Sequence, residues 1–208
     1  AVKRPDVVIG TSPQFFTACG AYLVSRIKRV PFVFELRDIW PESIKAVGAM
    51  DDSLVIRLLE KVEMFLYRKA ALIVSVTESF KNKLVQRGIT ADKIRVIRNG
   101  VDLSRFQPMQ KDAALVERFG LSGKFVAGYI GTHGLAHALE TLLEAAEILG
   151  KDKSIHFLFL GDGARKRDLM AATQRRGLDN VLFLDSVPKE EVVRYWSLLD
   201  VAIIHLRK

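Results

Sequence analysis

The sequence predicts an α/β protein built of two parallel-sheet pieces that join near residue 105. Apolar runs rich in Val, Ile and Phe alternate along the chain with segments of helical periodicity. These runs are almost continuously apolar, which is typical of strands in a parallel sheet that is covered on both faces. Alternating strands and helices also favour right-handed parallel crossovers, so each piece is expected to be a run of βαβ units.

The first piece is expected to contain four strands with helices between them. The strands are predicted at 6–12, 31–38, 71–77 and 94–100, and the helices at roughly 13–28, 52–70 and 78–88. The last helix follows Thr77, has Glu78 in its first turn and stops at Gly88, which are common start and stop signals. The chain opens directly on a strand, so we expect this piece to be truncated at its outer boundary.

The second piece repeats the pattern after an irregular segment at 103–122, which contains Pro108 and a short helix. Its strands are predicted in "KFVAGYIG", "IHFLFLGDG", "VLFLDSV" and "DVAIIHL", and its helices at 135–149, 164–176 and 189–198. The irregular segment predicts a hinge between two lobes. The sequence stops just after a strand, so this piece is also expected to be truncated.

Charge is distributed unevenly along the chain, whose net charge is +8. Residues 1–105 hold 18 Lys and Arg against 11 Asp and Glu, whereas the second half is almost neutral. A basic half predicts an anionic partner such as lipid headgroups, phosphates or nucleic acid, and the alternative is a merely solvated surface. The predicted helix at 52–70 carries Arg57, Lys61, Arg68 and Lys69. Such a helix either packs in its domain or lies on an anionic membrane.

Other composition features exclude some classes of protein. Apolar residues make up 49% and charged residues 27% of the chain, which is ordinary for a globular domain. The apolar runs are far shorter than the ~18 residues needed to span a bilayer. Cys19 is the single cysteine, so the sequence offers neither a disulfide framework nor a cysteine metal cluster. A reducing cytoplasm is the expected compartment.

Two glycine turns follow predicted strands of the second piece. Gly131 and Gly134 enclose the stretch "GTHG", where a backbone without side chains can approach a diphosphate closely. The helix predicted to begin near Leu135 would direct its free N–H groups and positive dipole end at the anion. The second turn, "GDG", contains Asp162 and Gly163. An ordinary tight turn is the alternative explanation for both.

Polar residues also follow strands of the first piece. Arg37 and Asp38 end the second strand, where they could bind a phosphate or pair with each other. Trp40 is predicted either to line a ligand site or to bury apolar area, and Glu42 is a further candidate contact. Asn99 precedes Gly100 in a turn that could also line a cleft.

Six segments occur in an order and spacing that resemble one known family. They are "PDVVIGTSP", "PFVFELRDIWPES", "IVSVTESFKNKLVQRGITADKIRVIRNGVDLSRFQP", "GYIGTHGLAHALETLLEAAEIL", "FLFLGDGARKRDL" and "VLFLDSVPKEEVVRYWSLLDVAII". Over nearly its whole length the chain is similar to the central part of family 4 (group 1) retaining glycosyltransferases. The branch that builds O-antigen and capsular polysaccharide carries a segment like "DIWPES".

The resemblance implies a GT-B fold, in which two Rossmann-like domains face a cleft. Residues 1–105 would form part of the acceptor-side domain and residues 106–208 part of the nucleotide-sugar domain. The implied catalytic residues are Arg37 and Asp38, and the implied acceptor contacts are Trp40, Glu42 and Asn99. The implied donor contacts are Gly131, Thr132, His133, Gly134, Asp162, Gly163, Ser186 and Val187.

The resemblance also implies the chemistry and the partners. Transfer would proceed with retention at the anomeric carbon and without a metal or cofactor. The donor would be a nucleotide-sugar, with a UDP-sugar favoured, and the acceptor a lipid-linked or growing glycan. The enzyme would act at the cytoplasmic face of the membrane, as a peripheral protein on an anionic surface, and would not bind nucleic acid.

The sequence departs from the family pattern at the diphosphate site. Many relatives have Arg directly after the first glycine and Lys five residues later, where this chain has Thr132 and His137. His133 and His137 are therefore predicted to donate N–H groups to the phosphate, unless they cap or pack on the helix. Arg165, Lys166, Arg207 or Lys208 are alternative sources of positive charge.

Two familiar elements of the family lie outside the sequence, namely an early glycine-rich loop and a pair of Glu eight residues apart. We therefore expect the 208-residue chain alone to have no measurable turnover. Two other functions fit parts of the sequence. A GT-B nucleotide-sugar epimerase would share the phosphate turns but would need further carboxylates and His. A non-catalytic basic module bound to membrane or nucleic acid would explain the charge but not the ordered motifs.

Overall fold

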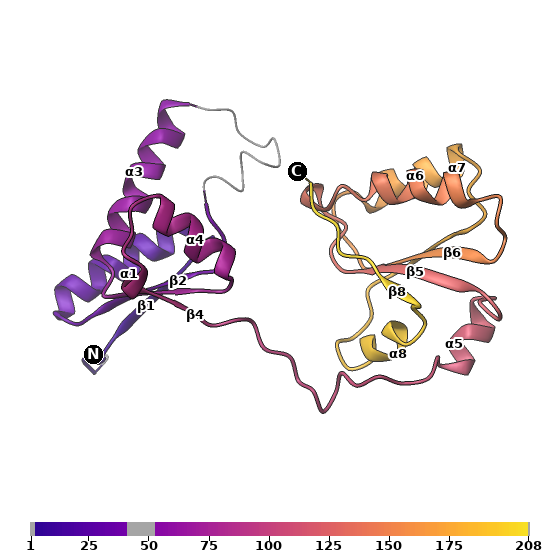
Figure 1. Ribbon diagram of the computed structural model, residues 1–208, viewed down its shortest axis with the longest axis horizontal. Helices are drawn as coiled ribbons and strands as arrows, with labels where there is room; N and C mark the ends of the chain where they lie inside the picture. Colours follow the sequence, from indigo (N-terminus) through magenta and orange to yellow (C-terminus); the bar gives the residue numbers. More distant parts are fainter. Residues whose placement is uncertain (1–2, 41–52, 208) are drawn as a thin grey trace. The chain divides into compact units, whose positions relative to one another are not determined.

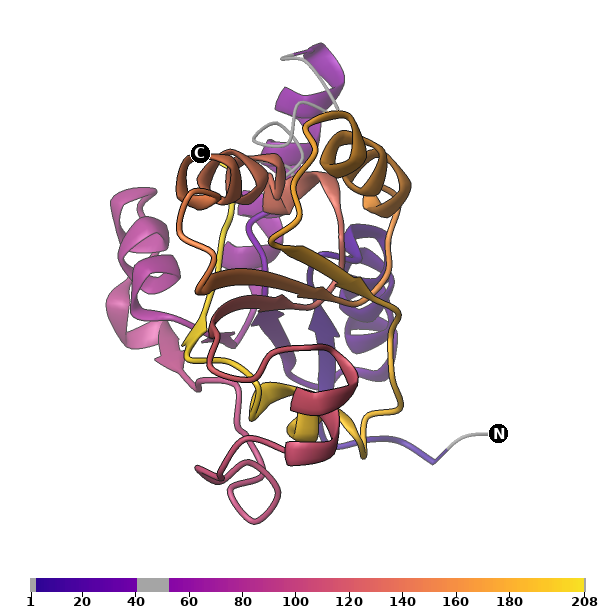
Figure 2. The same ribbon diagram turned by 90° about the vertical axis from the view of Figure 1, so that its right-hand side faces the viewer.

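The computed structural model describes residues 3–40 and 53–207, which form two compact units (Figures 1 and 2). Unit 1 comprises Ala1–Gly100 and unit 2 comprises Val101–Lys208. The boundary lies a few residues before the predicted position at 105. Each unit has its own parallel sheet and its own core, so each is described separately.

Unit 1 follows the predicted alternation of strands and helices. Its elements are β1 (Val8–Thr11), α1 (Phe15–Lys28), β2 (Phe32–Leu36), α3 (Leu54–Lys69), β3 (Leu72–Ser75), α4 (Glu78–Gln86), a 3-10 turn (Ala91–Lys93) and β4 (Ile94–Val96). The strands are parallel and lie in the order β1-β2-β3-β4. Each strand thus pairs with the next strand in the sequence, as short right-handed crossovers require.

The helices of unit 1 cover one face of its sheet. All three crossovers step in the same direction, and Figure 1 shows α1, α3 and α4 on the same side of the strands. Phe34, Ile73 and Ile94 are in register on the covered face and are buried. Ile9 points to the other face and is 62% exposed. The prediction of a sheet covered on both faces is therefore wrong for unit 1 within the described residues.

The starts of two helices in unit 1 follow from side chains that cap them. Ser53 accepts a hydrogen bond from the backbone N–H of Ile56, at 3.3 Å, at the start of α3. Thr77 accepts one from Phe80, at 3.1 Å, at the start of α4. Each hydroxyl satisfies an N–H group that the first helical turn leaves without an acceptor. The predicted start of α4 after Thr77 is thus confirmed.

Unit 2 is a parallel sheet with helices on both faces. Its elements are α5 (Ala113–Arg118), β5 (Phe125–Ile130), the 3-10 turn η2 (Leu135–His137), α6 (Glu140–Leu149), β6 (Ile155–Leu160), α7 (Lys166–Arg175), β7 (Val181–Leu184), α8 (Val192–Trp196) and β8 (Val201–Ala202). The strand order is β7-β6-β5-β8. Because the order reverses at β5, α6 and α7 lie on one face while α5 and α8 lie on the other (Figure 1).

One predicted helix of unit 2 is shorter than expected. The segment 135–149 begins as η2, and α6 starts only at Glu140. Ala138, between them, has a φ of 42°, a left-handed conformation that cannot continue a right-handed helix. The prediction of one continuous helix over 135–149 is therefore wrong, because α6 and its dipole begin six residues after Gly134. Within the described residues, no helix is long and apolar enough to cross a bilayer.

Candidate functional site

Three loops meet at the carboxyl edge of the sheet in unit 2. They follow β5, β6 and β7, and together they line a pocket of about 320 Å³. Its lining residues are Ile130, Gly131, Thr132, Leu160, Gly161, Asp162, Ser186 and Val187. The pocket thus brings together five of the predicted donor contacts from three separate segments. The strand order reverses at β5, whose loop lines the pocket. Open parallel sheets bind ligands at such reversal points, beyond the carboxyl ends of the strands.

The turns after β5 and β6 pack backbone against backbone. A Cβ atom at Gly161 would overlap the carbonyl oxygen of Gly131, and a Cβ at Gly163 would lie 2.5 Å from the carbonyl oxygen of His133. Both glycines also have positive φ values, 143° and 153°, which side chains rarely permit. A Cβ at Gly134 would meet the His137 ring, at 3.3 Å, and the methyl group of Thr132, at 3.7 Å. The positions where backbone atoms exclude a side chain are therefore Gly161 and Gly163.

Most backbone N–H groups of "GTHG" already have acceptors inside the protein. Gly131 donates to Leu160, at 2.9 Å, and His133 donates to the carbonyl oxygen of Asp162, at 2.8 Å. Gly134 donates to Thr132, at 3.0 Å. Among the described residues, only the N–H of Thr132 in this turn has no acceptor. Within this turn, Thr132 is therefore the residue whose backbone N–H the described structure leaves free for a diphosphate.

The imidazole of His133 is completely buried instead of facing the pocket. Its exposed fraction is 0%, and neither ring nitrogen has a hydrogen-bond partner in the described structure. The rings of Tyr129, Phe159 and Phe183 lie around it, with centroids 6.0 to 6.3 Å away. Burial and the nearby charge of Lys166 lower the pKa of His133 below its ordinary value. A neutral, buried ring does not fit the predicted side-chain contact with a phosphate.

His137 packs within its own loop. Its ring lies 5.7 Å from that of Tyr129, and its Nδ1 is buried without a partner in the described residues. Nδ1 of His205 is 2.7 Å from the carbonyl oxygen of His137, and it donates when it carries the proton. This contact joins the segment after β8 to the loop after β5. It fits the packing alternative for His137 rather than the phosphate contact.

Two of the predicted substitute cations are already paired. Arg165 binds Glu140, at 2.6 Å, and Asp168, at 2.9 Å. Burial alone would raise the pKa of Glu140, but the hydrogen bond from Arg165 and the charges of Arg165 and Arg207 lower it. The Nζ of the buried Lys166 donates to Gly161, to Leu184 and to the carboxylate of Asp185. Lys166 therefore connects the loops after β6 and β7 through its buried ammonium group and is not available to a ligand.

Of the predicted substitute cations within the described residues, Arg207 is the one that is exposed and has no ion pair. Its backbone N–H donates to the carbonyl oxygen of Ala136, at 2.8 Å, which places the residue next to η2. Lys208 lies outside the described residues. Gly163 and Gly134 support the turns without lining the pocket, while Ser186 and Val187 line it from the loop after β7.

The predicted catalytic pair in unit 1 is positioned by a serine that the sequence did not single out. Ser12 is buried, and its Oγ accepts hydrogen bonds from the backbone N–H groups of Arg37, at 3.1 Å, and Asp38, at 3.2 Å. The same hydroxyl donates to the carbonyl oxygen of Asp38, at 2.7 Å. The Arg37 side chain is exposed, and no ion pair joins it to Asp38 in the described structure. A serine directly after β1 was the sequence signal.

Two of the three predicted acceptor contacts, Trp40 and Asn99, lie within the described residues of unit 1. Trp40 is partly buried, and its ring stacks at a tilt on Phe15, with a centroid distance of 4.7 Å. Asn99 is exposed in the segment after β4. Glu42 lies outside the described residues. The stacking shows that Trp40 contributes to packing, which was one of its two predicted roles.

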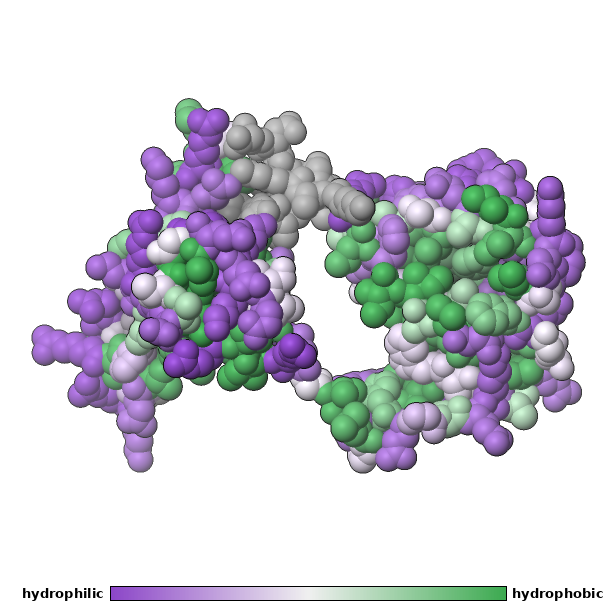
Figure 3. All heavy atoms as spheres, in the orientation of Figure 1, coloured by the Kyte–Doolittle hydropathy of each residue, from purple (hydrophilic) through white to green (hydrophobic). Residues whose placement is uncertain are grey.

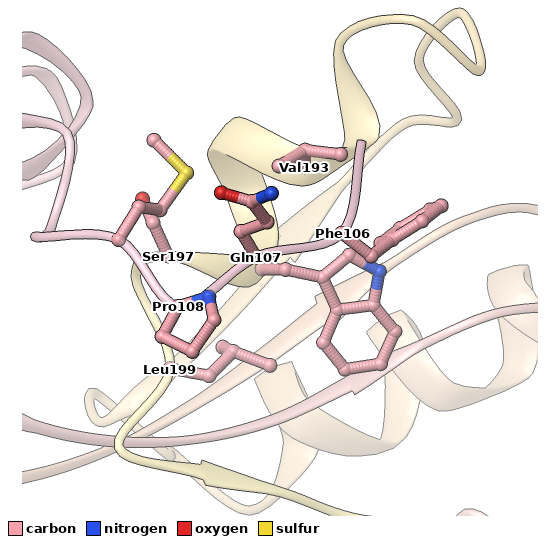
Figure 4. Close-up of a pocket in the computed structure, with 8 residues that line it drawn as sticks. Phe106, Gln107, Pro108, Val193, Ser197 and Leu199 are labelled. Atoms are coloured by element: carbon pink, nitrogen blue, oxygen red, sulfur yellow. The ribbon is translucent and has the colours of Figure 1, made fainter. Parts of the chain in front are cut away.

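A second concavity of unit 2 has a different character. It measures about 340 Å³ and lies between the segment Phe106–Met109 and the region of α8 (Figure 4). Phe106, Pro108, Val193 and Leu199 line it together with the polar side chains of Gln107 and Ser197 (Figure 4). It has no charged lining residue, so it offers no counter-charge to a diphosphate.

The described residues contain no group of three or more His, Cys, Asp or Glu placed to hold a metal ion.

Unit 2 belongs to the class of open parallel α/β domains that bind a ligand where glycine turns leave the strand ends. Comparison with known proteins defines the family. Residues 1–105 match the profile of Glycosyltransferase Family 4, which is half of the chain. The chain therefore belongs to Glycosyltransferase Family 4, and the predicted family is confirmed.

Curated relatives extend the match beyond unit 1. The chain is 27% identical over 210 residues to WcaI of Escherichia coli K12, a glycosyl transferase assigned to colanic acid biosynthesis. That match covers 98% of the chain and 50% of WcaI. The chain is also 31% identical over 156 residues to 2-deoxystreptamine glucosyltransferase of Streptomyces kanamyceticus, with coverage of 71% and 40%. The chain thus spans half or less of the length of these relatives.

Solved structures confirm the predicted fold. Anabaena HepE, determined in complex with UDP-glucose, has a TM-score of 0.75 and 20% identity over 95% of this chain and 52% of HepE. Sucrose-phosphate synthase of Thermosynechococcus elongatus has a TM-score of 0.73 and 16% identity, with coverage of 96% and 50%. The two parallel α/β units thus have the GT-B glycosyltransferase fold, of which the chain covers about half.

Proposed function

We propose that this chain is part of an enzyme that transfers a sugar from a nucleotide-sugar to a lipid-linked or polysaccharide acceptor. The transfer retains the anomeric configuration, needs no metal or cofactor, and serves cell-surface glycan synthesis. Family membership favours transfer over the epimerase and over the non-catalytic module. The similarity to WcaI supports a role in the synthesis of exported polysaccharide.

One observation carries the proposal for the donor. The loops after β5, β6 and β7 converge on one pocket at the carboxyl edge of the sheet, beside the point where the strand order reverses. The fold is shared with HepE, whose complex contains UDP-glucose. A UDP-sugar is therefore the proposed donor. The diphosphate of the donor would accept a hydrogen bond from the backbone N–H of Thr132. The base of the donor would contact the backbone of Ser186 and Val187.

The proposed chemistry needs little covalent participation by the protein. Holding an acceptor hydroxyl against the anomeric carbon removes much of the entropic barrier to transfer. Positive charge and backbone dipoles then stabilise the departing diphosphate as its charge develops. Arg37 and Asp38, held by Ser12, are the proposed catalytic residues of unit 1. Trp40, Glu42 and Asn99 are the proposed acceptor contacts, and the 208-residue chain by itself is proposed to be inactive.

The proposed place of action is the cytoplasmic face of a membrane. The surplus of Lys and Arg in residues 1–105 supports contact with an anionic surface. A lipid-linked acceptor would be presented at such a surface. Peripheral attachment would then bring the acceptor to unit 1 while unit 2 holds the soluble donor.

The donor proposal is tested by titrating the chain with UDP-glucose in a calorimeter. Ser186 is exposed at the pocket, so Ser186→Trp should fill the pocket and weaken binding by at least about tenfold, a loss of roughly 1.4 kcal/mol. Ser122→Trp is the matched control, because Ser122 is an exposed serine of unit 2 outside this pocket. Equal affinity in the two variants would contradict the assignment of the pocket.

A further inference from the structure

We propose that unit 1 carries a phosphate-binding pocket between α3 and α4, distinct from the candidate donor pocket of unit 2. This concave surface measures about 470 Å³. Its lining residues are Arg57, Glu60, Lys61, Met64, Arg68 and Arg87. Cationic side chains outnumber carboxylates in this lining, and Glu63 pairs with one of the cations, Arg87, from beneath.

The cations contributed by α3 share one face of the helix. Arg57, Lys61 and Arg68 are four and seven residues apart, which places them in one row beside α4. Lys61 and Arg68 form no ion pair within the described residues, so an anion in the pocket would meet two cations that lack a counter-ion there. These two side chains therefore favour an anionic ligand.

The cation contributed by the end of α4 is held in place from beneath. Nη2 of Arg87 lies 2.6 Å from Oε2 of Glu63, whose side chain is 2% exposed. The hydroxyl of Tyr67 donates to the other carboxylate oxygen of Glu63, also at 2.6 Å. The arginine therefore reaches the pocket with its position set by a buried anchor. A hydrogen-bond-donating side chain that is already held in position loses less conformational entropy when it binds a ligand.

Phosphate is the anion that suits this arrangement. A guanidinium presents five N–H donors in a fixed fork, and Arg87 uses one of them on Glu63 in the described structure. Arg68 adds a second fork and Lys61 a point charge, which together match the several oxygens and the double charge of a phosphate group. The phosphate could belong to an anionic lipid headgroup or to a soluble phosphate compound. Hydrophilic side chains dominate much of the surface of unit 1 (Figure 3).

The test compares two double variants of the 208-residue chain. Lys61→Gln with Arg68→Gln removes two pocket cations. Arg26→Gln with Lys28→Gln removes the same charge from exposed residues of α1 that do not line the pocket. Each protein is titrated with inorganic pyrophosphate in low salt. Each is also sedimented with vesicles of phosphatidylcholine, with and without phosphatidylglycerol.

The pocket variant should bind pyrophosphate, anionic vesicles or both at least about fivefold more weakly than the control variant, because charge-assisted hydrogen bonds are lost. Weakening with vesicles alone identifies a lipid headgroup as the source of the phosphate, and weakening with pyrophosphate alone identifies a soluble compound. Equal binding by the two variants, or no binding of either probe by the unmodified chain, would overturn the proposal. Unchanged UDP-glucose binding by the pocket variant separates this site from the donor pocket.

A further variant guards against a loss of structure. Both double variants should melt within a few degrees of the unmodified chain, because exposed substitutions usually change stability by less than about 0.5 kcal/mol. If the pocket variant melts early, Lys61→Glu alone reverses one charge without touching the buried anchor. Its pyrophosphate or anionic-vesicle affinity should then fall below that of Lys28→Glu, and equal affinities would also reject the site.

Discussion

Gly161 stands directly against the carbonyl oxygen of Gly131, so the turn after β6 supports the turn after β5 through direct backbone contact. A Cβ at Gly161 would overlap that oxygen, and the φ of 143° disfavours any side chain at this position. The loops after β5 and β6, which supply most of the candidate donor pocket, can therefore lie this close together only because position 161 has no side chain.

Gly161→Ala should lower the free energy of unfolding of unit 2 by about 3 kcal/mol, since it combines backbone strain with overlap. Thermal denaturation followed by circular dichroism measures the loss. Gly20→Ala is the control, because a Cβ at this position in α1 meets nothing within 4 Å. Alanine in the middle of a helix should raise stability by roughly 0.5–1 kcal/mol. Similar melting temperatures for the two variants would contradict the backbone-contact explanation.

The buried His133 should cost stability rather than serve the ligand. His133→Phe is expected to stabilise the protein by about 1 kcal/mol, because two ring nitrogens without partners are replaced by carbon. Phe159 and Phe183 already surround the position with aromatic rings. Chemical denaturation measures the change. A loss of more than about 1 kcal/mol would mean that the ring nitrogens have partners in solution.

The same histidine should make stability depend on pH. Burial and the charge of Lys166 lower the pKa of His133, so the folded state binds fewer protons than the unfolded state. The free energy of unfolding should therefore fall as the pH drops below about 6.5, the ordinary histidine pKa. His133→Phe should reduce this slope. His156 is partly buried, and partial burial and the charge of Lys124 lower its pKa, so it should leave a residual slope.

Binding of a UDP-sugar should be insensitive to His133 over the same pH range. Burial lowers the pKa of His133 and aromatic side chains enclose its ring, so the ring is not placed to donate a proton to an anion in the pocket. Calorimetric titration of the unmodified chain and of His133→Gln at pH 8 and at pH 6 provides the measurement. Tighter binding at pH 6 that disappears in His133→Gln would show that the ring reaches the phosphate after all.

The buried anchor of Arg87 should respond differently to two substitutions. Glu63→Ala leaves Arg87 and the Tyr67 hydroxyl without their acceptor, so it should cost about 3 kcal/mol. Glu63→Gln keeps one acceptor oxygen for the two donors, so its cost should be smaller than that of Glu63→Ala. Burial raises the pKa of Glu63, although the bonds from Tyr67 and Arg87 oppose the rise. This group therefore favours folding below its unfolded pKa, and its contribution is lost as the pH rises through the folded pKa.

Proteolysis should first cut the segment between the two units. Residues 97–112 contain neither helix nor strand, and Arg105 offers a trypsin site within them. Brief digestion followed by mass spectrometry should yield two fragments that correspond to the compact units. Early cleavage inside α3 or α7 instead would contradict two separately folded units.

Much of the fold could be predicted from the sequence because its signals are local. Near-continuous apolar runs such as Phe125–Ile130 identify buried parallel strands, and Thr77 marks the start of α4. The glycine turns at the ends of strands and the order of six segments indicated the family and its GT-B fold. The residues that line the strand-end pocket were also largely predicted, because the carboxyl ends of parallel strands meet at one edge of a sheet.

The tertiary structure alone decided which of the candidate side chains are available to a ligand. Lys166 is occupied by Asp185, nineteen residues away, and Arg165 by Glu140, twenty-five residues away. His133 is enclosed by rings from β5, β6 and β7. Pairing and burial arise between segments that are distant in the sequence, whereas periodicity and turn signals report only on neighbours. The family and the strand-end site thus follow from local pattern, while the availability of each charge follows from packing.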